Sequence, residues 1–166
     1  MRKGWLRLVS ILILPACFLT AQPIRTANCV LELFIPDRIE IALSVPVVDL
    51  GEPRRENGRL YYERINAVRV DYRCNTQDDW EVRISTEDFR DGNRRIPISR
   101  LQWRTEDGIY QDMPTSGRYV VLARKRDHQP RAGLKHSKNI SYRLELRGDE
   151  WGGTYFAPIT YTLFVP

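Results

Sequence analysis

Apolar and polar residues alternate along much of this chain with a period of two, which is typical of half-buried β-strands. The clearest stretch is 67–74, where Val68, Val70, Tyr72 and Cys74 fall on one face and charged residues on the other. Similar patterns predict strands at 38–45, 80–85, 118–123, 140–146 and 154–165, and shorter extended pieces at 29–35, 47–50 and 101–103. We expect 67–74 and 80–85 to form an antiparallel hairpin.

Turn signals separate these stretches at Asn57-Gly58, at Asp91-Gly92-Asn93 and at Gly148-Asp149. The pattern contains no amphipathic helix of three turns. Six to nine short strands at regular spacing favour an all-β fold, and we expect an immunoglobulin-like β-sandwich with Greek-key connections. The expected core residues are Val70, Tyr72, Trp80, Val82, Ile84, Trp103, Tyr142, Leu144, Ile159, Tyr161 and Leu163.

The first residues predict export. Arg2, Lys3 and Arg7 precede an apolar run at 8–19, which is typical of a signal peptide and shorter than the ~20 residues of a membrane span. Cleavage after Ala21 would divide the chain into a signal peptide, 1–21, and a single domain, 22–166. A lipoprotein box ending at Cys17 is the alternative. No later apolar stretch is long enough for a membrane anchor.

Removal of the signal peptide changes the charge balance. The whole chain has a formal net charge of +5, but the signal peptide carries three of its 26 basic residues and none of its 21 acidic ones. The mature domain would therefore carry a net charge of +2. This small excess gives no support to a nucleic-acid partner.

The mature domain would keep two cysteines, Cys29 and Cys74. In an oxidising compartment the expectation is one disulfide between them, and two buried free thiols are the alternative. Closing a loop of this size would stabilise the fold by roughly 3–4 kcal/mol in the chain-entropy model.

Four features follow one another along the chain: Cys29, the piece VDLG at 48–51, the strands VRVDYRC and WEVRI at 68–74 and 80–84, and the ending GTYFAPITYTL at 153–163. In this order they resemble the secreted pilin-like β-sandwiches of bacteria, of the spore-coat-protein-U and fimbrial-subunit group. The ending is also similar to that of bacterial WxL cell-wall domains. The resemblance covers about half of the mature chain.

This resemblance implies an immunoglobulin-like sandwich at the cell surface, which in such families often assembles by strand donation between subunits. A donor arm would be expected before the first cysteine. Residues 22–28 are short and polar there apart from Ile24. We therefore expect a stand-alone domain, or one that terminates an assembly.

No residue set in the sequence predicts catalysis, a metal site or a cofactor. His128 and His136 stand eight residues apart, which matches no zinc-ligand spacing, and no nucleophile elbow or phosphate loop is present. Asp88, Asp91 and Asn93 lack the later glutamate of a calcium loop, so we interpret them as a polar turn.

A basic stretch at 124–138 carries the candidate ligand-binding residues. They are Arg124, Lys125, Arg126, Arg131 and Lys135, joined by Trp151 as a candidate exposed aromatic. The stretch is either a patch for anionic glycans or cell-envelope polymers, or a solvated loop.

The sequence thus predicts an exported, non-catalytic structural and interaction domain, periplasmic, at the cell surface or extracellular. Its partners would be other envelope or surface proteins, reached by edge-strand pairing. The alternative function is a binding module for anionic glycans through the basic stretch.

Overall fold

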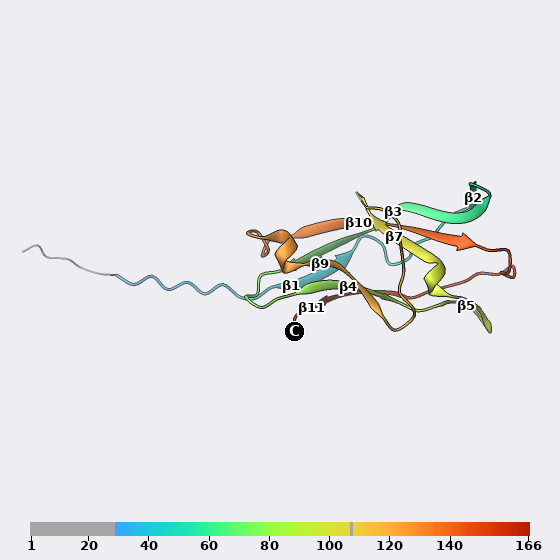
Figure 1. Cartoon of the computed structure of the whole chain (residues 1–166). Coiled ribbons are helices and arrows are strands. Elements are labelled where there is room, and N and C mark those ends of the chain that lie inside the picture. The colour runs from blue at the N-terminus through green and yellow to red at the C-terminus, as the bar shows by residue number, and fades with distance from the viewer. Residues whose placement is uncertain (1–28, 107) are drawn as a thin grey trace, which may run out of the picture. The chain divides into compact units, whose positions relative to one another are not determined.

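The computed structural model describes residues 29–106 and 108–166 (Figure 1). The predicted signal peptide and Cys17 lie outside these residues. The chain divides into two units at Phe34, and the second unit, residues 35–166, holds all the described strands. None of the described helices is long and apolar enough to cross a membrane.

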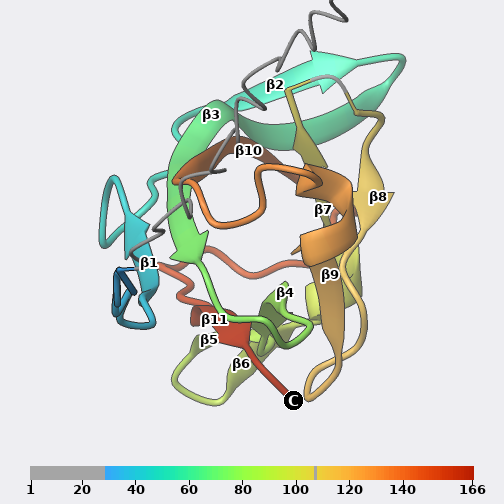
Figure 2. The same ribbon diagram turned by 90° about the vertical axis from the view of Figure 1, so that its left-hand side faces the viewer.

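The second unit is built almost entirely from antiparallel strands in two packed sheets, seen end-on in Figure 2. The larger sheet contains β1 (Ile39–Leu43), β2 (Pro53–Glu56), β3 (Arg59–Cys74), β7 (Leu101–Thr105), β8 (Gln111–Asp112) and β10 (His136–Leu146). The smaller sheet has the order β11 (Ile159–Phe164), β4 (Glu81–Thr86), β9 (Tyr119–Arg124). A hairpin of β5 (Phe89–Asp91) and β6 (Arg94–Ile96) and two 3-10 turns, η1 (Ile98–Arg100) and η2 (Lys125–His128), complete the elements.

Strand β3 organises the larger sheet. Its first half pairs with β2 across the Asn57-Gly58 turn, its second half pairs with β1, and β10 runs along both halves. A bulge between Ile140 and Tyr142 breaks the β10 register, and opposite it Asn66 takes a positive φ of 50°. The Asn66 amide donates a hydrogen bond to Ser141 Oγ at 3.0 Å, which satisfies the displaced backbone.

The core lies between the two sheets, where alternating side chains from both meet. Eight of the eleven expected core residues are buried, and Ile159, Tyr161 and Leu163 of β11 are half-buried against them. Ile96 of β6, Ile98 of η1 and Met113 just after β8 are buried with them. The all-β prediction is confirmed.

Three expectations about elements are wrong. Residues 67–74 and 80–85 do not form a hairpin, because β3 and β4 belong to different sheets and residues 75–80 cross between the layers. Residues 29–35 form no strand. Residues 124–138 are not one loop, since η2 opens the stretch and β10 begins at His136.

Candidate interaction site

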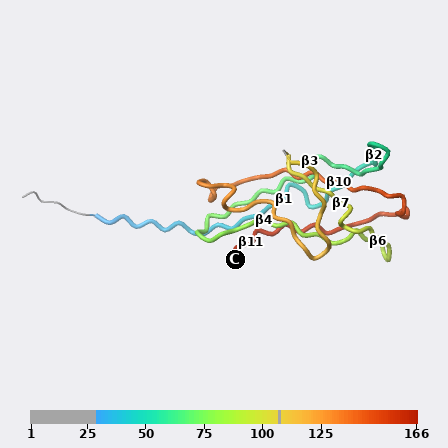
Figure 3. Tube along the Cα trace, viewed as in Figure 1, coloured from blue at the N-terminus to red at the C-terminus, as the bar shows by residue number. Residues whose placement is uncertain are grey.

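One side of the sandwich is open, where the edge strands β1 and β11 lie next to each other (Figure 3). Ile39, Ile41 and Leu43 pair in register with Cys74, Tyr72 and Val70, so their side chains lie on the same inner face as these buried residues. They are nevertheless 53%, 37% and 42% exposed. Inner-face apolar side chains that remain exposed mark a place where the core is unfilled.

The backbone of both edge strands is also unpaired on this side, within the described residues. At the two ends of β1, Arg38 and Ser44 make the hydrogen bonds to β3. By the alternation of an antiparallel ladder, the N–H and C=O groups of Ile39, Ile41 and Leu43 therefore point to the free edge. On β11, the Pro158 carbonyl accepts a hydrogen bond from the Glu87 amide beside β4. By the same alternation, the N–H and C=O groups of Ile159, Tyr161 and Leu163 point away from β4 and have no partner within the described residues.

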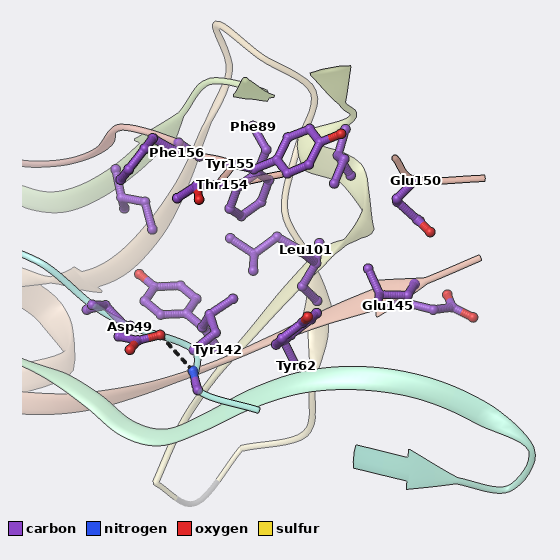
Figure 4. Close-up of a pocket in the computed structure, with 18 of the residues that line it drawn as sticks. Asp49, Tyr62, Phe89, Leu101, Tyr142, Glu145, Glu150, Thr154, Tyr155 and Phe156 are labelled. Carbon is purple, nitrogen blue, oxygen red and sulfur yellow. Dashed lines mark hydrogen bonds between the residues drawn. The ribbon is translucent and has the colours of Figure 1, made fainter. Parts of the chain in front are cut away.

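The seam widens into a groove at Leu43 and Tyr161. The groove has a volume of about 1630 Å³, and its two lips are the unpaired segment 45–51 and the segment 154–158. Tyr62, Leu101, Tyr142, Phe89 and Phe156 line it, and Figure 4 shows Phe89, Tyr155 and Phe156 above Leu101, Tyr142 and Tyr62. The groove is therefore bounded mainly by aromatic and aliphatic side chains from both sheets.

The polar groups of the groove satisfy one another. The Tyr142 and Tyr161 hydroxyls form a hydrogen bond that joins the larger sheet to the smaller one. Burial raises the pKa of Tyr161 to about 12 and that of Tyr142 well above its ordinary value, so both hydroxyls stay protonated.

At the rim of the groove the acidic side chains are also paired. Glu150 accepts hydrogen bonds from the Arg100 guanidinium and from the Arg147 and Gly148 amides. Glu145 pairs with Arg59 at 3.2 Å. The groove therefore presents an apolar floor without an unpaired charge on these acids, which suits an apolar chain segment better than a charged ligand.

Just before the domain, residues 30–35 form an apolar segment, which we term the arm. Five of its six side chains are large and apolar, and Val30, Leu31, Leu33, Phe34 and Ile35 are between 68% and 93% exposed. Only Glu32 is charged. The arm has no strand partner among the described residues.

The chain enters β1 through a fixed point at Asn75. The Arg38 amide donates to Asn75 Oδ1 at 2.5 Å, Asn75 Nδ2 donates to the Pro36 carbonyl at 3.1 Å, and the Asn75 amide donates to the Arg38 carbonyl at 3.2 Å. These bonds extend the β1–β3 ladder and hold Pro36 and Arg38 along it.

The predicted basic residues fall into two groups, of which Arg124, Lys125 and Arg126 lie together. Arg124 lies near Glu81 at 3.6 Å, Lys125 Nζ donates to the Gln77 and Asp78 carbonyls, and Arg126 is 4.0 Å from Asp127. These three basic residues line a small cavity of about 350 Å³.

The other candidate ligand residues lie elsewhere. Lys135 pairs with Asp71 at 3.5 Å, and Arg131 is exposed and contributes its carbonyl to His136. Trp151, the candidate exposed aromatic, is 76% exposed, and it lines the apolar groove and not the basic cavity.

Both cysteines are free thiols in the structure, so the expected disulfide is absent from it. Cys29 is exposed, whereas Cys74 is buried with its Sγ 3.3 Å from Thr76 Oγ1. Asp88, part of the polar turn, is also buried; it accepts the Ile98 amide and pairs with Arg95 at 2.5 Å. Within the described residues no three metal-ligating side chains gather in one place.

The sequence interpretation missed the arm and the groove. It assigned 29–35 to an extended piece of the domain, because continuous apolar residues are also typical of a fully buried strand. The available signal was that an extended arm would carry large apolar side chains on both of its faces, with Glu32 as the one exception. A strand at the edge of a domain usually has one polar face. Such a segment needs packing partners on both faces.

Comparison with known proteins found no matching family model, no matching curated protein and no matching solved structure.

Proposed function

We propose that this chain is an exported, non-catalytic interaction domain that binds an extended apolar strand in the groove between β1 and β11. The observation that carries this proposal is the exposure of Ile39, Ile41 and Leu43 on an inner face, beside backbone groups with no partner. An added strand would satisfy both deficits, since its backbone can pair at the edge and its side chains can fill the core.

The occupant that we propose is the arm of a second copy. Its six residues would extend for about 20 Å, and β11 also has six residues. In an extended arm, Leu31, Leu33 and Ile35 share one face, and Val30, Glu32 and Phe34 share the other. The first set has no charge and would face the groove, which would leave Glu32 at the surface.

The chain's own arm is a poorer occupant. To lie along β1 it would have to reverse direction within residues 36–38, and the hydrogen bonds of Asn75 hold Pro36 and Arg38 along the β1–β3 ladder. A second copy has no such restriction. The arm after Cys29 would then supply the donor segment that residues 22–28 lack.

Burial of the arm is large enough to drive association. Each large apolar side chain that becomes fully buried contributes about 1.5–3 kcal/mol. Three of them would offset much of the entropy cost of joining two molecules, which is about 4–15 kcal/mol. The backbone bonds at the edge would add to this.

The experiment is a sedimentation analysis of the mature chain over a wide range of concentration. We expect concentration-dependent association, and Leu33→Asp should weaken it by roughly 100-fold because a carboxylate would enter an apolar groove. Glu32→Gln is the matched control on the other face and should associate like the wild type.

A synthetic peptide of residues 30–37 separates the two halves of the proposal. It should bind to the Leu33→Asp protein, whose groove is intact, and it should block association of the wild type. Failure of the peptide to bind would contradict the strand-accepting groove. A wild-type chain that stays monomeric at every concentration, although the peptide binds to the Leu33→Asp protein, would instead assign the groove to the chain's own arm.

Two finer assignments from the sequence stay predictions that accompany this proposal: an immunoglobulin-like Greek-key topology and a pilin-like role at the cell surface or in the periplasm. Oxidation of Cys29 and Cys74 is a third prediction, and it competes with donation of the arm, because the bond would hold the start of the arm at Cys74, next to the Asn75 that holds its end. Mass spectrometry of the freshly secreted protein under non-reducing conditions tests the last of these. A mass two protons lower than that of the dithiol is expected, and two thiols that react with alkylating reagent would contradict it.

A further inference from the structure

The only two histidines of the chain stack face to face at the end of the sandwich away from the groove-lining residues. The rings of His128 and His136 have their centroids 3.9 Å apart and are inclined by 21°. His128 ends η2 and His136 begins β10, so the stack closes the connecting loop, residues 129–135. We call this pair of rings the histidine stack.

The core residues Tyr72 and Trp80 anchor the histidine stack. The Trp80 ring stacks on His128 with an interplanar angle of 18°, and the Tyr72 hydroxyl lies 2.9 Å from His128 Nε2. Burial raises the pKa of Tyr72 to about 12, so its O–H stays protonated and can donate to a neutral His128. His136 Nε2 in turn donates to the Arg131 carbonyl at 3.1 Å, within the loop.

The charges around the stack act against a second proton. Burial lowers the pKa of His128, and His136 and then Lys138 lower it further, while Asp127 acts in the opposite direction. Lys138 is itself held by the Leu122 carbonyl. From β3, Asp71 pairs with Lys135 and Arg73 donates to the Gly133 carbonyl, so those loop contacts do not depend on the imidazoles.

We propose that the histidine stack is a pH-sensitive latch, which holds loop 129–135 on the end of the domain when both rings are neutral and releases it when both are protonated. One imidazolium can remain, because Trp80 offers a cation–π surface. Two imidazolium ions cannot stay face to face at this separation in a half-buried place. Release would expose Trp80 and Tyr72 to solvent or to a partner.

The direction of the pH dependence follows from the folded state. A histidine that is protonated less readily when folded contributes its full stability above its ordinary pKa of 6.5 and loses it as the pH falls below that value. The latch is therefore closed at neutral pH and opens on acidification. The proposal does not depend on strand binding at the groove.

The test is hydrogen exchange of the mature chain at pH 7.5, pH 6.5 and pH 5.5, corrected for the intrinsic exchange rate. Exchange in peptides that cover 126–137 should change little between pH 7.5 and pH 6.5 and should increase by up to about tenfold between pH 6.5 and pH 5.5, as release coupled to one additional proton requires. Peptides from β7 should stay protected, which excludes global acid unfolding.

His136→Phe keeps an aromatic ring in the stack and removes one titrating group. Its loop should stay protected at pH 5.5, whereas Asp127→Asn, which removes the charge that raises the pKa of His128, should keep the response and move it to lower pH. Equal responses in the wild type and His136→Phe would overturn the proposal.

A second measurement is independent of the variants. The Cε1–H resonance of His128 should titrate below the ordinary histidine pKa. Titration of His128 at the ordinary pKa would also overturn the latch.

Discussion

At the scale of single residues, the hydrogen bond between Tyr142 and Tyr161 shows how the molecule closes its core beside an open groove. The two hydroxyls come from different sheets. Each provides the other with a hydrogen-bond partner, so neither hydroxyl is unpaired at the aromatic floor of the groove.

Tyr161→Phe should therefore destabilise the fold although it deletes only one oxygen. The Tyr142 hydroxyl would remain buried without its partner, at a cost of about 1–3 kcal/mol. The double variant Tyr142→Phe, Tyr161→Phe should recover part of this loss, because neither hydroxyl is then left unsatisfied. Urea unfolding measures both. A double variant less stable than the sum of the single variants would contradict this reading.

At the scale of elements, Asp88 fastens the β5–β6 hairpin to the turn that follows it. Its carboxylate accepts the Ile98 amide at the start of η1 and pairs with Arg95 of β6. The hairpin is thereby fixed to η1, and both Ile96 at the end of β6 and Ile98 at the start of η1 are buried. The residue considered as a calcium ligand in the sequence thus has two protein partners.

Asp88→Ala should lower the free energy of unfolding by about 1–3 kcal/mol, because the buried Ile98 amide loses its acceptor. The melting temperature of the wild type should be the same with calcium and with a chelator. The neighbouring substitution Asp91→Ala, in which the carboxylate has only a weak partner in Arg94 at 3.6 Å, should cost much less. Stabilisation of the wild type by calcium would contradict the structural role.

At the scale of the whole domain, the core of the sandwich is closed along most of its length and open to solvent along one seam. The residues between β3, β10 and β4 are buried, whereas the seam between β1 and β11 leaves apolar side chains in solvent. A monomer with such a seam carries an apolar surface that monomeric proteins seldom expose.

The Leu33→Asp protein should accordingly bind the apolar dye ANS, which becomes fluorescent on exposed hydrophobic surface. The peptide of residues 30–37 should displace the dye, while the same peptide with aspartate in place of Leu33 should not. Fluorescence titration gives both answers. Dye that stays bound in the presence of saturating peptide would place the apolar surface elsewhere.

The alternation of side chains predicted most strands and most of the core, because it reports which face of a strand is buried. It could not report which sheet a strand joins: 67–74 and 80–85 alternate equally well in a hairpin and in two separate layers. The bulge at Ile140 and the left-handed Asn66 depend on contacts that are distant in sequence, so no local pattern reveals them.

The candidate site was harder to predict for a related reason. An open groove forms where a sheet edge has no neighbouring strand, and the sequence of a strand does not indicate whether it will lie at an edge. The run of basic residues predicted a binding site because charge can be read directly from a sequence. In the structure, several of these residues interact with carboxylates or backbone carbonyls of the same chain. Likewise, the separation of eight residues between His128 and His136 did not indicate that their rings stack.

The arm and the groove are different surfaces of one chain, and this difference limits the symmetry of any assembly they form. If two copies exchange their arms, the assembly closes as a twofold dimer; if each arm passes on to a further copy, the contact repeats head to tail and yields a larger ring or an open filament. An open filament would be polar. It would end in an empty groove at one tip and an unused arm at the other, and each tip would require its own kind of cap.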